Sequence, residues 1–162
     1  MSKIIYSIYN HTNFSWQLYI LSGYIRRDFF RTCKQYLSPD HPKNTYKGLI
    51  LQDGVSNIII PIADSDTNSK ALYLAKKYQT LLFEEINESL YNEYFTQLER
   101  KFELVVEQAP YFLEWFEKFQ SRYADTIDPQ IILSEMSDYS IENFHTFVQD
   151  NFCSAQTEYI VN

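Results

Sequence analysis

The segment from Ile86 to Val106 reads INESLYNEYFTQLERKFELVV, and its pattern decides how the rest of the chain must pack. Its large apolar residues recur at steps of four and three, the spacing that lines one face of an α-helix. These residues are Ile86, Leu90, Tyr94, Leu98, Phe102 and Val105. One face of this helix must be buried, so we expect a domain in which other elements pack against it.

A polar stripe accompanies the same segment on the side away from the apolar face, if each residue turns the helix by about 100°. Besides Asn92 and Thr96, it contains the carboxylates of Glu85, Glu88, Glu99 and Glu103. We expect these four side chains to be exposed, because the opposite face provides the packing surface.

Length and composition indicate one folded domain, residues 1–162, with a sizeable core. Hydrophobic residues make up 45% of the chain and charged residues 22%, which argues against disorder. Aromatic residues reach 17% while there are only 3 glycines, a balance that favours large packed side chains over tight turns. No repeat or linker divides the chain.

The first 62 residues carry the strand signals. Residues 4–9 favour a strand, and residues 49–51 and 55–62 flank Asp53 and Gly54 as in a hairpin. Pro61 predicts an edge strand or a bulge at that point. Residues 13–22 fit a strand or a helix, while 24–37 fit a helix; Gly23 argues against one long helix through both.

Helices fill the remainder of the predicted fold. The apolar faces of residues 71–82 and 86–105 point about 160° apart, and an unbroken helix over 70–108 would be about 60 Å long, so we expect a break between Phe83 and Ser89. Further helices are expected from Pro110, from Asp128 with Pro129, and after Ser140. Residues 158–161 are expected to be extended, at the sheet.

The predicted fold class is therefore α+β and mostly α-helical. A small antiparallel β-sheet from the N-terminal part packs on C-terminal helices within a single domain.

Candidate catalytic groups are few. Glu142 and His145 have the spacing of half a di-iron site, but that architecture needs the pattern twice, so we expect no metal and no cofactor. Cys153 and His145 remain the residues that a small enzyme would use. The sequence has no serine-hydrolase turn and no phosphate-binding loop, and we expect a protein that is not an enzyme.

The expected location is the cytoplasm. The chain shows no export signal and no apolar run of the roughly 20 residues that span a membrane. Cys33 and Cys153 are then expected to be reduced, buried thiols.

Charge is unevenly distributed along the chain. Residues 1–83 contain ten Lys and Arg against five Asp and Glu, a balance of +5, whereas residues 84–162 contain four against sixteen, a balance of −12. Either the two halves neutralise each other in the fold, or the acids form ordinary solvated faces, or the acidic half meets a basic partner. A basic helix surface at Arg26, Arg27, Arg31 and Lys34 pairs with the acidic half or, as a minor hypothesis, contacts phosphates. With a net charge of −7, direct binding of nucleic acid is not expected.

The acids after Glu84 alternate with tyrosines, and such a surface suits recognition of a basic protein. In size, acidity, aromatic content and lack of catalytic motifs, the chain resembles the small acidic immunity proteins with which bacteria neutralise a sibling toxin. This resemblance implies a toxin partner, which we expect to be a basic nuclease whose active site is covered. The expected partner-binding residues are Glu85, Glu88, Glu99, Glu103, Asp125 and Asp138. An intracellular adaptor or regulatory subunit is the alternative, and the oligomeric state remains open.

Overall fold

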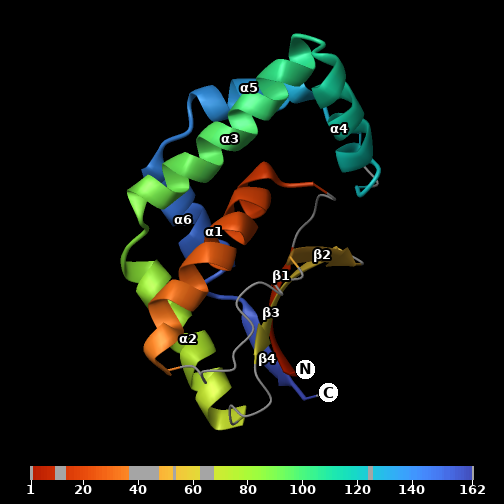
Figure 1. Cartoon of the computed structure of the whole chain (residues 1–162). Coiled ribbons are helices and arrows are strands. Elements are labelled where there is room, and N and C mark those ends of the chain that lie inside the picture. The colour runs from red at the N-terminus through yellow and green to blue at the C-terminus, as the bar shows by residue number, and fades with distance from the viewer. Residues whose placement is uncertain are drawn as a thin grey trace.

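A computed structural model describes residues 2–9, 14–36, 48–52, 54–62, 68–123 and 126–161 (Figure 1). The strands are β1 (Ser2–Tyr9), β2 (Gly48–Gln52), β3 (Val55–Ile62) and β4 (Gln156–Ile160). The helices are α1 (Trp16–Cys33), a short 3-10 turn (Lys34–Tyr36), α2 (Asn68–Glu84), α3 (Glu88–Val106), α4 (Pro110–Gln120), α5 (Pro129–Ser137) and α6 (Ile141–Asn151). The predicted class, α+β and mostly helical, is confirmed.

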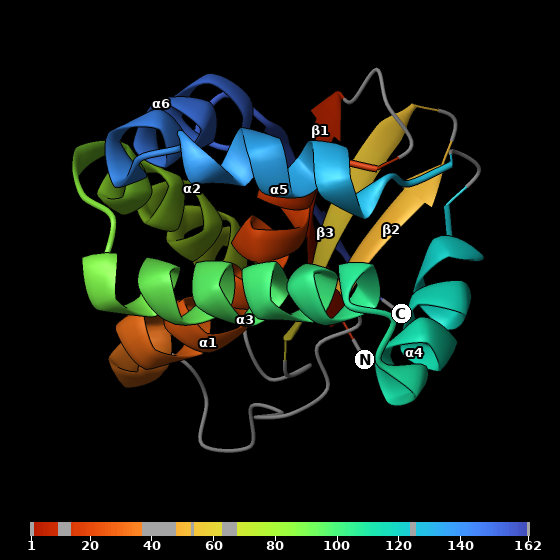
Figure 2. The same cartoon turned by 90° about the horizontal axis from the view of Figure 1, so that it is seen from above.

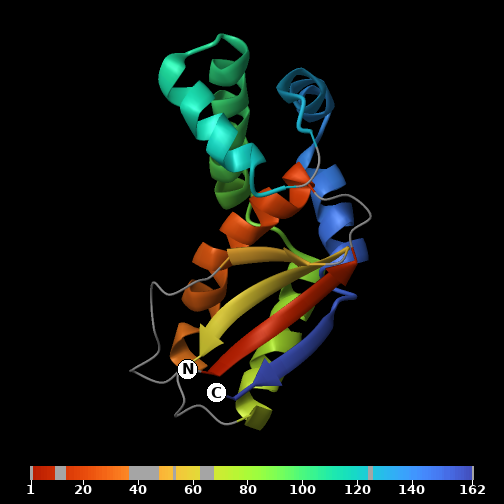
Figure 3. The ribbon, with the colours of Figure 1, turned by 90° about the vertical axis from the view of Figure 1, so that its right-hand side faces the viewer.

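The strands form one antiparallel sheet in the order β2-β3-β1-β4. The predicted hairpin is present as β2 and β3, and the predicted C-terminal extended segment is β4, which pairs with β1 from Lys3↔Ile160 to Ser7↔Gln156. Figure 3 shows the two ends of the chain side by side at one end of the sheet. The first strand thus lies inside the sheet, and the last strand forms the edge beside it.

Pro61 does not make β3 an edge strand. β3 lies between β2 and β1, but β2 pairs only as far as Gly48↔Ile59. Among the described residues, Pro61 lies beyond that point and pairs with Lys3 of β1, so its missing N–H removes no bond to β2 as described.

The ambiguity over residues 13–22 resolves as helix from Trp16 onward, and residue 13 lies outside the described residues. α1 begins at Trp16, with Ser15 as N-cap, whose Oγ accepts a hydrogen bond from the Leu18 N–H at 3.2 Å. The expectation that Gly23 interrupts this helix is wrong. Gly23 lies within α1. The position needs a glycine because the Tyr94 ring of α3 occupies the space of a side chain, and a Cβ there would lie 2.8 Å from Tyr94 Cε1.

The predicted break after Phe83 is confirmed, since α2 ends at Glu84 and α3 begins at Glu88. Asn87 is the N-cap of α3, and its Oδ1 accepts a hydrogen bond from the Leu90 N–H at 3.0 Å. The later helices also begin where their caps predict, at Pro110, Pro129 and Ile141. Local cap chemistry therefore sets these boundaries.

The helices cover one face of the sheet. In Figure 1, α1 and α2 lie against it and α6 packs on these two helices, and in Figure 2 α3 crosses above α1 with α5 alongside. Alternate residues of β1, Ile4, Tyr6 and Ile8, point into the core. The predicted apolar face of α3 is buried at Leu90, Leu98, Phe102 and Val105, while Tyr94 is half-buried. α3 thus joins the aromatic core between α1 and the later helices.

Candidate functional site

An open pocket of about 580 Å³ lies where α1 meets the junction of α2 and α3. It is lined by Tyr24, Asp28, Thr32, Leu81, Leu82, Glu84, Glu85, Ile86, Asn87 and Glu88. Four of these residues carry carboxylates, and they come from α1, from the end of α2, from the connecting segment and from the start of α3. The pocket brings together two of the predicted partner-binding residues, Glu85 and Glu88.

Hydrogen bonds fix the connecting segment in place. The Tyr24 hydroxyl of α1 accepts a hydrogen bond from the Asn87 N–H at 2.8 Å, and the Asn87 side chain in turn caps α3. Because α1 holds the residue between Glu85 and Glu88, both glutamates start from a backbone that is tied to the core. The site is therefore positioned by the fold and not by a free loop.

Asp28 is the buried carboxylate of the pocket, with 6% of its surface exposed. The Tyr78 hydroxyl donates to its Oδ2 at 2.8 Å, and Arg31 Nη2 donates to its Oδ1 at 3.1 Å. These two donors compensate its burial. By contrast, Glu84, Glu85 and Glu88 are exposed, and none of them has an ion-pair partner within the described ranges.

Two helix ends meet at the pocket, and their partial charges oppose each other: the carbonyls at the end of α2 are negative and the N–H groups at the start of α3 are positive. The negative potential of the pocket therefore comes from its four carboxylates. Tyr24 lies buried beside these groups. Burial raises the pKa of its hydroxyl to about 12, and the charges of Asp28 and Glu85 contribute in the same direction, against opposing contributions from Asn87 and Arg31. A cation, such as an ammonium or a guanidinium, is the group that this pocket suits chemically.

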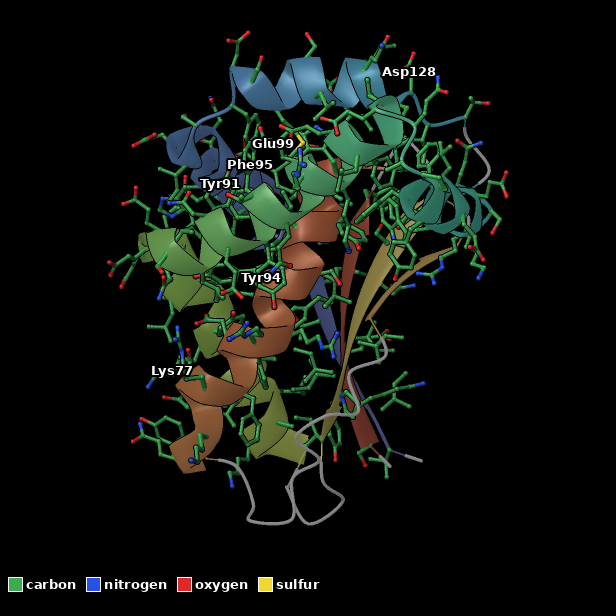
Figure 4. The ribbon with its side chains drawn as sticks, turned by 45° about the horizontal axis from the view of Figure 1, so that its top comes forward. Lys77, Tyr91, Tyr94, Phe95, Glu99 and Asp128 are labelled. Carbon is green, nitrogen blue, oxygen red and sulfur yellow. The ribbon has the colours of Figure 1, made fainter. Side chains whose placement is uncertain are left out.

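The other predicted residues lie elsewhere. Glu99 and Glu103 are half-buried, although the polar stripe was expected to be exposed. Glu99 lies in a row with Tyr91 and Phe95 along one edge of α3 (Figure 4). Burial raises the pKa of the Glu99 carboxyl, with the Glu103 charge as the second cause. Glu103 accepts a hydrogen bond from Arg100 at 3.1 Å.

The structure therefore divides the predicted stripe. Glu88 and Glu103 are separated by fifteen positions, which is about 22 Å along a helix. Glu88, Asn92 and Thr96 of the stripe are exposed as expected, so within α3 the departure from the prediction is confined to Glu99 and Glu103. Asp138 is exposed at the C-terminal end of α5, and Asp125 lies outside the described residues.

Sequence reasoning missed Asp28 and Glu84 as pocket residues. Asp28 follows Tyr24 by four positions and precedes Phe29, so an acid stands on the buried side of a predicted helix. A charge in that position needs a partner, and this signal was present in the sequence. Glu84 carried no comparable signal, because its role depends on where α2 ends.

The candidate catalytic side chains are engaged by backbone carbonyls. His145 Nε2 lies 3.0 Å from the Leu82 oxygen and 2.9 Å from the Phe83 oxygen, at the end of α2. Cys153 Sγ donates to the Gln79 oxygen at 3.2 Å, and burial raises the pKa of its thiol to about 11. Burial raises the pKa of the Cys33 thiol to about 12, ahead of the effect of the Asp28 charge. Both thiols are therefore protonated at neutral pH, and a protonated thiol is a poor nucleophile.

One residue of the basic surface of α1, Arg27, pairs with the acidic half of the chain, whereas Arg31 pairs with Asp28 of α1 itself. Arg27 Nη1 of α1 lies 2.7 Å from Glu93 Oε1 of α3. Part of the charge asymmetry along the sequence is thus neutralised in the fold.

No family model matches this chain, and no curated protein matches it either. Its fold is similar to that of a solved structure described as a predicted insulinase family protease from Yersinia pestis, with a TM-score of 0.54 and 12% sequence identity. The match covers 98% of this chain but 39% of the other, so the chain spans well under half of that protein. At this identity the likeness shows the fold alone. The present sequence contains neither H-E-x-x-H nor H-x-x-E-H, the two zinc-protease patterns.

Within the described ranges, no helix combines the length and apolar character needed to cross a bilayer. The same residues contain no group of three or more His, Cys, Asp or Glu side chains placed to hold a metal ion.

Proposed function

We propose that this protein is a cytoplasmic, non-catalytic binding protein that neutralises a basic toxin, a nuclease, by covering its active site. The observation that supports this most directly is the acidic pocket at the α2–α3 junction. There, Glu84, Glu85 and Glu88 are exposed and have no ion-pair partner among the described residues, and they line the same pocket as the buried Asp28, which accepts hydrogen bonds from two donors.

The pocket would act by accepting a lysine or arginine side chain of the partner. An incoming ammonium or guanidinium would exchange its hydrogen bonds to water for hydrogen bonds to the carboxylates of Glu84, Glu85 and Glu88. The hydrogen bond between Tyr24 and Asn87 would keep these acceptors in position. Charge-assisted hydrogen bonds of this kind are about twice as strong as neutral ones. A nuclease needs such cations for its phosphate substrate, so occupying them blocks the substrate.

The remaining predicted residues belong to the periphery of the proposed interface. Glu99, Glu103 and Asp138 would contribute mainly long-range attraction, which changes the rate of association more than that of dissociation, while Asp125 lies outside the described residues. The pocket glutamates would contact the partner directly, so their loss would change the rates of both association and dissociation.

The test begins with capture of the partner by the tagged full chain and its identification by mass spectrometry. Association with that partner is then measured for a variant with Glu84, Glu85 and Glu88 replaced by Lys. We expect at least a tenfold slower association than for the unmodified protein, and a weaker dependence of the rate on salt.

The matched control replaces Glu107, Glu114 and Glu117 by Lys, which changes the net charge equally at exposed positions on the α3–α4 connection and α4. We expect this control to retain most of the association rate. An equal loss in both variants would show that net charge, and not the pocket, attracts the partner. Capture of a stable complex without an enzyme in it would support the alternative, an adaptor or regulatory subunit.

A further inference from the structure

α1 and α2 run antiparallel along one exposed face of the molecule, with the acidic pocket at one end of that face. Pocket residues Asp28 and Thr32 of α1 stand opposite Leu81 and Leu82 of α2. Further toward the end of α1, Tyr36 meets Lys77 of α2. We call the surface formed by Thr32, Tyr36, Tyr73, Lys76, Lys77, Leu81, Glu84, Glu85 and Glu88 the α1–α2 face.

The end of this face away from the pocket is basic and aromatic. Lys77 Nζ lies 5.3 Å from the centre of the Tyr36 ring and 5.7 Å from that of the Tyr73 ring, so two rings flank one ammonium. Tyr73 is 60% exposed and Tyr36 39%. Lys76, next along the chain, is also exposed, and Figure 4 shows Lys77 on the outer side of the α1–α2 pair.

The centre of the face is less polar than its ends. Leu81 is 36% exposed, and Thr32 is exposed opposite it. Lys77 and Glu84 are seven positions apart, about 10 Å along α2. The face therefore presents, in order, a basic aromatic end, an apolar centre and an acidic end.

We propose that the α1–α2 face binds a second copy of this chain through a two-fold axis near Leu81. In such an interface the same patch meets itself in reverse, so the basic end of each copy lies on the acidic end of the other. Both ends find a complementary charge at once, while Leu81 of one copy meets Leu81 of its partner. A second copy of the chain therefore carries, on this same face, charges complementary to both of its ends.

The net charge of −7 opposes association at long range. At about 0.1 M salt, repulsion is screened beyond roughly 10 Å, whereas contacts made across the interface are screened much less. Dimerisation should therefore occur at moderate ionic strength and weaken at about 0.5 M salt. If the proposed function also holds, the dimer covers the acidic pocket and must separate before the basic partner binds. The dimer itself does not depend on that function.

The test is sedimentation velocity of the full chain over a concentration series at both salt levels. Two variants are compared with it: one with Lys76 and Lys77 replaced by Glu, and one with Glu84, Glu85 and Glu88 replaced by Lys. Each alone should dimerise at least tenfold more weakly, because like charges then face each other twice. A variant with Lys118 and Arg122 replaced by Glu, both exposed and away from the face, should dimerise like the unmodified chain.

Mixing the two charge-reversed variants is the decisive measurement. In the mixed pair, each end again meets the opposite charge, so a heterodimer should form where neither variant dimerises alone. A monomeric unmodified chain at all concentrations, or a mixture that stays monomeric, would overturn the proposal. If a variant proves unfolded by circular dichroism, Leu81→Ser provides the second test, and undiminished dimerisation of that variant would overturn it as well.

Discussion

Glu99 shows how a packed neighbour changes the chemistry of one carboxyl. It is half-buried on α3 and has no cationic partner among the described residues. Burial, and secondly the Glu103 charge, raise its pKa. A carboxyl whose pKa is higher in the folded than in the unfolded state favours folding when it is protonated. The contribution of the carboxyl to folding stability is therefore fully present below its pKa in the unfolded state, and it is lost as the pH rises through its pKa in the folded state.

Replacing Glu99 by Gln should consequently stabilise the protein at neutral pH, since the amide carries no charge. We expect the urea midpoint of the variant to exceed that of the unmodified chain at pH 7, and the difference to vanish below about pH 4. The control is Glu93→Gln, which removes the surface pair with Arg27 and should leave the midpoint unchanged or slightly lower. A lower midpoint for Glu99→Gln at pH 7 would contradict this interpretation.

Individual side chains also show why the pocket was only partly predictable. Glu88 follows from helical spacing, because its exposure depends on one helix, whereas Glu85 lies on the connecting segment, outside the helical period that predicted it. The groups that fix the pocket come from distant positions: Tyr24 binds Asn87 across 63 positions, and Tyr78 binds Asp28 across 50. Such pairings depend on how the helices pack, and no local pattern encodes them.

At the scale of elements, helix starts were predictable because their caps are local. Asn87, Asp128 and Ser140 each accept a hydrogen bond from an N–H two or three residues ahead, within a single turn. The helix over residues 16–22 was not decided by its sequence, since its apolar residues suit either period. It is fixed by tertiary contacts, including the close approach of α1 and α3 at Gly23.

That close approach gives a prediction for Gly23→Ala. In a free helix, alanine is about 1 kcal/mol better than glycine. Here the new Cβ would lie 2.8 Å from the Tyr94 ring, and overpacking typically costs about 1–3 kcal/mol. We expect a net loss of about 1 kcal/mol, measured by urea unfolding.

A double-mutant cycle separates these two effects. In a Tyr94→Ala background the obstructing ring is absent, so Gly23→Ala should stabilise the protein by up to about 1 kcal/mol. The substitution should thus change sign between the two backgrounds. Stabilisation in both would show that the Tyr94 ring moves aside without cost.

At the scale of the whole molecule, the topology determines both the strand order and how the charges of the two halves are distributed in space. The first and last parts of the chain are interleaved, with β1 between β3 and β4 and with basic α1 against acidic α3. A separation of +5 and −12 along the sequence therefore does not become two separate poles in space. Sequence reasoning placed the last strand at the sheet but could not fix its neighbour, because strand order depends on long-range pairing.

The same topology predicts how the fold depends on β4. This strand pairs with β1. Just before it, the Phe152 and Ala155 oxygens accept hydrogen bonds from the Gln79 amide of α2 at 2.8 and 3.0 Å. Thr157 Oγ1 donates to Gln79 Oε1 at 3.3 Å. A chain ending at Ala155 would lose the ladder and leave one side of the central strand unpaired.

We expect this truncated chain to unfold at a much lower temperature, with a broader transition by circular dichroism, because β1 then becomes an exposed edge. A chain lacking only residues 161–162 should melt like the full protein, since Val161 is 66% exposed and lies beyond β4. Adding a synthetic peptide of residues 155–162 in excess should raise the melting temperature of the truncated chain by refilling the strand. If the truncated chain melts at the temperature of the full protein, the pairing of β1 with β4 contributes little, and the sheet is held by the hairpin and the helices.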